Sequence, residues 1–211
     1  MNDFQKFIKA GFSANVALFI TYPIDIYKIN IQSFQNIKNN NMFKYYKGIL
    51  PVIPLTFVEK GIKIFTYDHF RNKFDSGNFS FRAALIAGLF QGPLTNPIDI
   101  IKIRNQIRNT KIPLYRGLHL TYLRDIPFNL VFFGISDSFD NPYSKFAASF
   151  IGTTLVTPID VIKTRYSEDT NVTIKEIVKK TKLNDYFKGI VPRVLSVGFF
   201  YGITYNLFLY L

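Results

Sequence analysis

The stretch Thr21–Gln32, TYPIDIYKINIQ, decides the fold because its pattern returns twice further along the chain. It closes an apolar run with a proline, an acid two residues later and a lysine three residues after that. The spacing recurs at intervals of 74 and 61 residues. A fixed pattern in triplicate is the signature of a repeat architecture. The three copies are Pro23-x-Asp25-x-x-Lys28, Pro97-x-Asp99-x-x-Lys102 and Pro158-x-Asp160-x-x-Lys163.

A second motif follows each copy and starts another apolar run at its glycine. It pairs an aromatic residue with a base and a glycine, and the order of elements is the same each time. We therefore predict three repeats of two helices each, covering residues 1–75, 76–141 and 142–211. The second motif reads Tyr46-Lys47-Gly48, Tyr115-Arg116-Gly117 and Phe187-Lys188-Gly189.

Six charge-free apolar runs predict an all-α membrane protein with six transmembrane helices. Only the last run has the ~18 residues that indicate a spanning helix by themselves. The others reach that length if their charged ends belong to the helix, which is tolerated where a helix faces a water-filled cavity. A soluble bundle of six buried helices is the alternative, but the links are short and the aromatics many. The runs are 10–24, 48–58, 83–98, 126–136, 146–159 and 194–211.

Composition and charge narrow the function classes. The chain has 211 residues, 48% of them hydrophobic, a net charge of +12 and no Cys, which excludes disulfides, thiolate metal sites and cysteine catalysis. The links after the first, third and fifth runs hold 16 of the 26 Lys and Arg residues. The positive-inside rule places these links on the cytoplasm-equivalent side and both termini on the other. No signal peptide is expected at the N-terminus.

The triplicated motif has a physical interpretation of its own. Proline removes a backbone donor and kinks a helix, so the odd-numbered helices bend together at one end. An acid and a base three residues apart lie near one face of a helix. Three such helices around an axis can exchange partners, each acid meeting the next helix's lysine. The alternative is three separate surface pairs within single helices.

With these motifs the whole chain resembles the mitochondrial carrier family. The resemblance implies three pseudo-symmetric repeats around a central cavity, and a monomer that transports a small anionic solute by alternating access across the mitochondrial inner membrane. It implies a matrix gate that pairs Asp25 with Lys102, Asp99 with Lys163 and Asp160 with Lys28. Gln32 and Gln106 match the glutamines that brace this gate, whereas Ser167 takes the third position.

An outer gate is matched only in part. The family pattern of aromatic, acid and base fits Tyr67, Asp68 and Arg71. Ser136-Asp137 lacks the base, and the last helix ends without either charge. We therefore expect a weak outer network.

The three motif glycines also predict lipid sites. Free backbone N–H groups at a helix N-terminus bind phosphate, and the resemblance implies cardiolipin at Gly48, Gly117 and Gly189. Lys47, Arg116 and Lys188 stand beside them. Interfacial anchoring by an aromatic and a base is the alternative.

Counting along the even-numbered helices from each glycine predicts the substrate site. Arg124 offers a fork for a carboxylate or phosphate. Ionisable groups at membrane depth are functional candidates by default, although Glu59 and Lys63 also fit a structural pair and Arg193 a support for the gate. The predicted site is Leu55, Thr56, Lys63, Arg124, Asp125, Arg193 and Ser196.

Two substrate classes stay open. The Arg124–Asp125 pair resembles amino-acid carriers, whereas the basic cavity and four aromatics, Phe128, Phe132, Phe200 and Tyr201, favour a base. The Ile, Lys and Asn bias is similar to that of a large DNA virus or another AT-rich genome, with a host cell's mitochondrion as the location in the viral case. We place a nucleotide or deoxynucleotide first and an amino acid or carboxylate second.

Other function classes have less support. A degenerate carrier that binds without transporting is the alternative of another class, and a soluble nucleic-acid-binding protein is a third. No nucleophile motif or Gly-rich phosphate loop indicates an enzyme. His69 and His119 lie 50 residues apart and form no ligand cluster. We expect no cofactor, no metal and no nucleic-acid partner.

Overall fold

The computed structural model describes residues 3–32, 45–46, 48–74, 80–107, 111–139 and 142–210. Its regular elements are helices, which confirms the all-α class. Six of them are long, and two short ones lie between α5 and α7. The elements are α1 (Asp3–Gln32), α2 (Ile49–Phe74), α3 (Phe81–Ile107), α4 (Leu118–Ser138), α5 (Pro142–Glu168), α6 (Ile174–Lys180), the 3₁₀ helix η2 (Leu183–Phe187) and α7 (Ile190–Tyr210).

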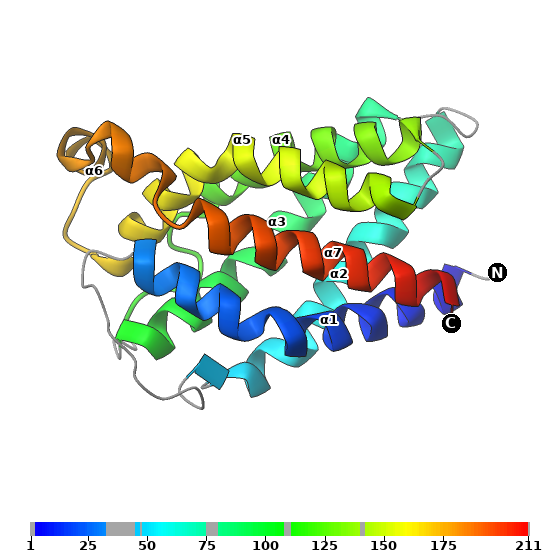
Figure 1. Cartoon of the computed structure of the whole chain (residues 1–211), viewed down its shortest axis with the longest axis horizontal. Helices are drawn as coiled ribbons and strands as arrows, with labels where there is room; N and C mark the ends of the chain where they lie inside the picture. The colour runs from blue at the N-terminus through cyan, green and yellow to red at the C-terminus, as the bar shows by residue number, and fades with distance from the viewer. Residues whose placement is uncertain are drawn as a thin grey trace.

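The six long helices form a closed ring. Each packs against its neighbours in chain order, and α7 closes the ring by packing against α1. The odd-numbered helices α1, α3 and α5 also contact one another. Both chain ends lie at one end of the ring, and α6 lies at the opposite end (Figure 1). The division into three two-helix repeats remains a prediction that agrees with this order.

The ring is apolar outside and polar inside. Large apolar side chains are exposed along every long helix, for example Phe19, Phe65, Phe90, Leu123 and Leu155. Charged and polar side chains are buried in the interior instead. This inversion of a soluble protein's pattern is what a helix ring around a polar cavity needs in lipid.

Two helices are long and apolar enough to span a membrane by length and composition alone. They cover Phe4–Gln32 in α1 and Tyr143–Glu168 in α5. The C-terminal run, which the sequence singled out, is not one of them within the described residues. In α7 the apolar residues are interrupted by Arg193, Asn206 and three tyrosines.

The motif glycines directly precede α2, α4 and α7, as predicted. Gly48, Gly117 and Gly189 have φ of 82°, 75° and 73°, a left-handed conformation that favours glycine. Each glycine also packs closely on the end of an odd-numbered helix of the next repeat. A Cβ on Gly48 would meet the Asn105 side chain at 1.8 Å, and one on Gly189 would meet Gln32 at 3.3 Å. The glycines thus set both the start and the close packing of these helices.

The proline and tyrosine of the two motifs meet in the first repeat. Pro23 lies inside α1 and cannot donate to the carbonyl of Phe19, four residues earlier. The hydroxyl of Tyr46 donates to that carbonyl at 3.2 Å. A side chain of the second motif therefore satisfies the backbone group that the first motif leaves free.

Candidate functional site

Six charged residues from α1, α3 and α5 form an inter-helix ring, named here the gate ring. Lys102 Nζ lies 2.6 Å from Asp25, and Lys28 Nζ lies 2.6 Å from Asp160. Lys163 pairs with Asp99 in the same sense. Each lysine thus reaches the next helix and not the acid three residues before it. The ring consists of Asp25, Lys28, Asp99, Lys102, Asp160 and Lys163.

Gln32 does not brace the gate ring. Its Nε2 donates to the carbonyl of Lys188 at 3.3 Å, and its Oε1 accepts from Thr164 at 3.2 Å. No described hydrogen bond joins it to a gate charge. It ties α1 to α5 and to the start of α7, because its side chain extends past the ring. The side chain of Gln106 lies outside the described residues, and the Ser167 hydroxyl is buried without a described partner.

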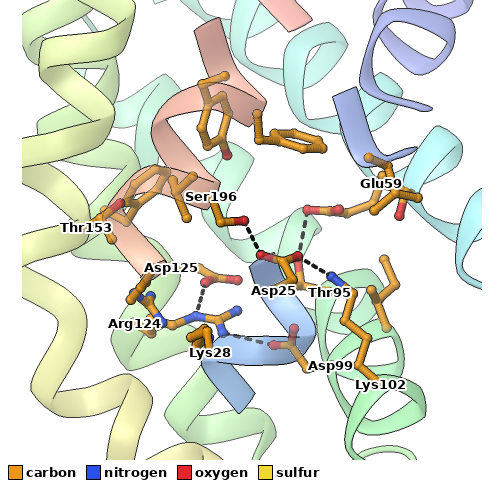
Figure 2. A pocket seen from close by; sticks show the side chains of 18 of the residues that line it. Asp25, Lys28, Glu59, Thr95, Asp99, Lys102, Arg124, Asp125, Thr153 and Ser196 are labelled. Atoms are coloured by element: carbon orange, nitrogen blue, oxygen red, sulfur yellow. Dashed lines mark hydrogen bonds and ion pairs between the residues drawn. The ribbon is translucent and has the colours of Figure 1, made fainter. Parts of the chain in front are cut away.

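A cavity of about 160 Å³ lies against the gate ring and takes residues from all six long helices. Five of the predicted site residues line it (Figure 2). Leu55 and Lys63 are not among the described residues that line it, and the predicted site as a whole stays a prediction. Leu55 packs against the apolar cluster of α1 and α3. The five lining residues are Thr56, Arg124, Asp125, Arg193 and Ser196.

Three of the predicted substrate residues bind the gate acids from the cavity side. Arg124 donates through Nη1 to Asp99 at 2.9 Å and to Asp160 at 3.0 Å. Arg193 also contacts Asp160, and the Ser196 hydroxyl donates to Asp25. The gate ring therefore forms one end of the cavity, referred to here as the cavity floor.

Asp125 is held by its neighbour in the chain. Its Oδ1 accepts from Arg124 Nε at 2.7 Å. Its Oδ2 is buried, and no described donor reaches it. In Figure 2 the Asp125 carboxylate lies beside the guanidinium of Arg124. The pair that the sequence predicts is formed, but Asp125 is engaged in orienting Arg124.

Lys63 lies in an aromatic cage on the other side of the cavity. Its side chain is 1% exposed, and its Nζ donates to the Tyr201 hydroxyl at 2.7 Å. The ammonium lies 4.7 to 5.4 Å from four ring centroids, within the range of cation–π attraction. The four rings are those of Phe128, Phe132, Phe133 and Tyr201.

These rings and Tyr205 form a layer, named here the aromatic layer, between α4 and α7. The Phe132 centroid lies 4.5 Å from Tyr201 and 5.7 Å from Phe128. Phe128 and Tyr201 line the cavity, so the layer is its wall opposite the gate ring. Three of the four aromatics that the sequence offers for stacking a base pack on one another here; the fourth, Phe200, lines the cavity.

The outer charges are found beyond this layer and are loosely paired. Tyr67 donates to Asp137 and stacks on Phe133. Arg71 lies 3.7 Å from Asp137 and is 26% exposed. Asp68 pairs with Lys6 of α1 at 3.4 Å.

Sequence reasoning missed two bases of this outer group. Lys6 lies on α1 and Lys145 on α5, whereas the family pattern of aromatic, acid and base concerns the other three long helices. Lys145 Nζ lies 4.0 Å from Asp137 Oδ1. Their positions near the outer ends of α1 and α5 could have indicated that they pair with the outer acids.

Sequence reasoning also missed a polar network around Glu59. Glu59 Oε1 accepts from Lys60 Nζ at 2.7 Å, Gln91 Nε2 at 2.8 Å and the Thr95 hydroxyl at 3.0 Å. Asn129 donates to Gln91 at 3.0 Å. Glu59 therefore pairs with Lys60 and not with Lys63. The network could have been predicted from Gln91 and Thr95, an amide and a hydroxyl four residues apart inside an apolar run.

Two of the three predicted lipid bases, Arg116 and Lys188, are engaged with the protein. Arg116 donates to the carbonyls of Tyr166 at 2.7 Å and Asp169 at 2.6 Å. These are orphan carbonyls at the C-terminal end of α5. Lys188 lies 3.0 Å from Asp185 and holds the pKa of that carboxyl below its usual value. Lys47 lies outside the described residues, and cardiolipin binding remains a prediction.

Comparison with known proteins identifies relatives. No family model matches the chain. It is 27% identical, over 97% of its length, to a calcium-binding mitochondrial carrier protein of Dictyostelium discoideum. It is 29% identical over 85% to the electrogenic aspartate/glutamate antiporter SLC25A13 of Mus musculus, and 25% identical over 75% to mitochondrial substrate carrier family protein X of Dictyostelium discoideum.

The chain spans 35% and 34% of the length of the first two of these relatives and 68% of the third. All three are mitochondrial carrier proteins, which confirms the expected localisation in the mitochondrial inner membrane. The closed ring of six helices and the motif repeated on α1, α3 and α5 accompany this similarity to mitochondrial carrier proteins.

Proposed function

We propose that this protein moves a small carboxylate-bearing metabolite across the inner membrane by alternating access. The observation that supports this is the position of Arg124, which bridges Asp99 and Asp160 at the cavity floor. A substrate carboxylate is the same chemical group as the gate acids that Arg124 binds. The cavity is thus built around a guanidinium that already holds carboxylates.

This arrangement couples binding to the gate. Arg124 Nη2 and Arg193 Nη2 make no hydrogen bond to the described residues, so a ligand can approach them without breaking a pair. Once bound, the carboxylate competes with Asp99 and Asp160 for the same two guanidinium groups. A ligand shifts a conformational equilibrium only through differential affinity, and this competition supplies it.

Among candidate substrates, we rank an acidic amino acid or a dicarboxylate above a nucleotide. The relatives include antiporters named for aspartate and glutamate. The cavity of about 160 Å³ is also smaller than the ~300–1,000 Å³ typical of sites for larger ligands. A nucleotide is the second candidate, because Phe200 and Tyr201 line the same basic cavity.

Exchange in liposomes tests the proposal. Vesicles are loaded in parallel with aspartate, glutamate, succinate, ATP and dATP, and uptake of the matching labelled solute is measured. We expect exchange of the acidic amino acids or the dicarboxylate. Correctly inserted protein that exchanges none of the five would contradict transport and support a non-transporting binding protein.

Arg124→Ala tests the role of the guanidinium. We expect uptake to fall at least a hundredfold, since a charge-assisted contact contributes about 1.5–3 kcal/mol and the gate acids lose a partner as well. Arg82→Ala removes an exposed arginine at the start of α3 and is the matched control. Unchanged uptake by a correctly inserted Arg124 variant would remove this residue from the site.

A further inference from the structure

We propose that Glu59 recognises the amine of the substrate, which narrows the substrate class to an amino acid and rests on the proposed carboxylate transport. Glu59 lines the cavity on α2 and is 3% exposed. In Figure 2 its carboxylate extends from α2 into the cavity, across from the Arg124–Asp125 pair. Each wall therefore carries an acid paired with a base, Glu59 with Lys60 on α2 and Asp125 with Arg124 on α4.

The Glu59 carboxylate is fixed through one of its oxygens only. Lys60, Gln91 and Thr95 all donate to Oε1. Asn129 of α4 in turn holds Gln91, so the network joins α2, α3 and α4. A carboxylate held in this way is oriented before any ligand arrives, which lowers the cost of binding.

The other oxygen is open to the cavity. No described donor reaches Glu59 Oε2, and it is not among the buried polar atoms that lack a partner. One turn earlier on the same face, the Thr56 hydroxyl also lines the cavity without a described hydrogen bond. Together they offer two acceptors, one of them charged, to an ammonium group.

Asp125 is less suited to this task than the sequence indicates. Its Oδ1 is bound to Arg124, and its Oδ2 is buried without a described donor, although Asp125 is among the residues that line the cavity. Glu59 Oε2 is not buried in this way, whereas a substrate amine could reach the buried Asp125 Oδ2 only if neighbouring side chains moved. The geometry thus assigns the amine to α2 and the carboxylate to Arg124 and Arg193.

The fold itself does not require a carboxylate at this position. Glu59 stands eleven residues after Gly48, and the same offset from Gly117 and Gly189 gives Phe128 and Phe200. A phenyl ring therefore satisfies the packing in the other two repeats. An ionisable group at membrane depth is costly, and here it appears at a single one of three equivalent positions.

The test compares substrates that differ only in the amine, L-glutamate and glutarate, in the liposome assay. In Glu59→Gln the amide oxygen can keep the place of Oε1 while its NH₂ group replaces Oε2, so an acceptor becomes a donor. We expect the preference for glutamate over glutarate to fall about tenfold or more, the loss of one charge-assisted hydrogen bond. Glutarate, which lacks the amine, is the reference substrate within the same variant, so the ratio of the two uptakes is read and not either uptake alone.

Thr56→Val is the second variant and leaves the Glu59 network intact. We expect it to lower the same preference about tenfold, the effect of losing one hydrogen bond from the ammonium to the hydroxyl. If Glu59→Gln fails to insert into the membrane, Thr56→Val still tests the amine site. An unchanged preference for glutamate in Thr56→Val would then overturn the proposal. Asp125→Asn, which keeps the Arg124 contact, should leave the preference within about twofold.

The outcomes separate this inference from the proposed function. Wild-type protein that exchanges neither acid contradicts carboxylate transport itself. Wild-type protein that exchanges both acids equally overturns the amine site alone. Exchange with a glutamate preference that survives Glu59→Gln assigns Glu59 a structural role and also overturns the inference.

Discussion

At one end of the cavity three lysines reach across to aspartates of neighbouring helices, whereas at the other end a lysine is enclosed by aromatic rings. The gate ring takes its groups from α1, α3 and α5, and the aromatic layer takes its rings from α4 and α7. Side chains of different helices meet at both ends, but different interactions join them.

The difference determines what can open each end. Ion pairs exchange partners readily when a competing ion arrives, and a carboxylate ligand is such a competitor for Arg124. Ring contacts and buried apolar area have no anionic competitor. We infer that ligand binding acts directly on the gate ring, while the aromatic layer opens only when α2, α4 and α7 move apart.

Charge reversal in the gate ring should give the largest effect. Asp99→Lys faces Lys163 and Arg124 with a third positive charge, and breaking a buried pair costs about 3–5 kcal/mol. We expect uptake to be lost and thermal stability to fall. Adding Lys163→Asp should restore part of both; the restoration stays partial because Arg124 still meets the new lysine. Absence of any rescue would contradict the inter-helix pair.

Truncation in the aromatic layer should come next. Phe132 is fully buried among Phe128, Phe133 and Tyr201, so Phe132→Ala should cost about 3–5 kcal/mol of stability. It should also let an impermeant thiol reagent reach a cysteine placed at Val197 from the outer face. The chain has no cysteine of its own, which makes the labelling specific. Phe12→Ala, at an exposed ring, is the control.

Equal labelling in Phe132→Ala and in the control would show that the aromatic layer does not close the outer side. The gate ring should be unaffected, so labelling of Val197→Cys from the matrix face should not rise. Labelling from the matrix face therefore distinguishes local loss of the aromatic layer from general unfolding, which would raise labelling from both faces.

The outer charges should matter least. Arg71 is 26% exposed and lies 3.7 Å from Asp137, a geometry whose contribution is about 0–1 kcal/mol. We expect Arg71→Ala to change uptake less than threefold and to shift the melting temperature by only a few degrees. A tenfold loss of uptake would mean that the charges, and not the rings, close this end.

Much of the fold follows from short-range patterns in the sequence. The spacing of Pro23, Asp25 and Lys28 and its two copies require helices, and the glycine motifs mark where the next helices start. These features depend on backbone geometry within a few residues of each position. Membrane spans were harder to predict, because α2, α3, α4 and α7 place polar residues inside the ring and so dilute their apolar signal.

The site was predicted less completely. Counting from the glycines found Thr56, Arg124 and Ser196 on the cavity side, because one helix face repeats every three to four residues. The same count placed Lys63 in the cavity, and its long side chain turns instead toward Tyr201. Gln91 and Asn129 gave no charge signal and were missed.

The sequence by itself therefore determined the number of long helices, their order and the faces that carry the charges. Only the tertiary structure decided the partners: Arg124 with two gate acids, Lys63 with four rings, and Glu59 with Lys60 and Gln91. The physical reason is that helix periodicity fixes the direction of a side chain, whereas its partner depends on residues from other helices that meet it across the ring.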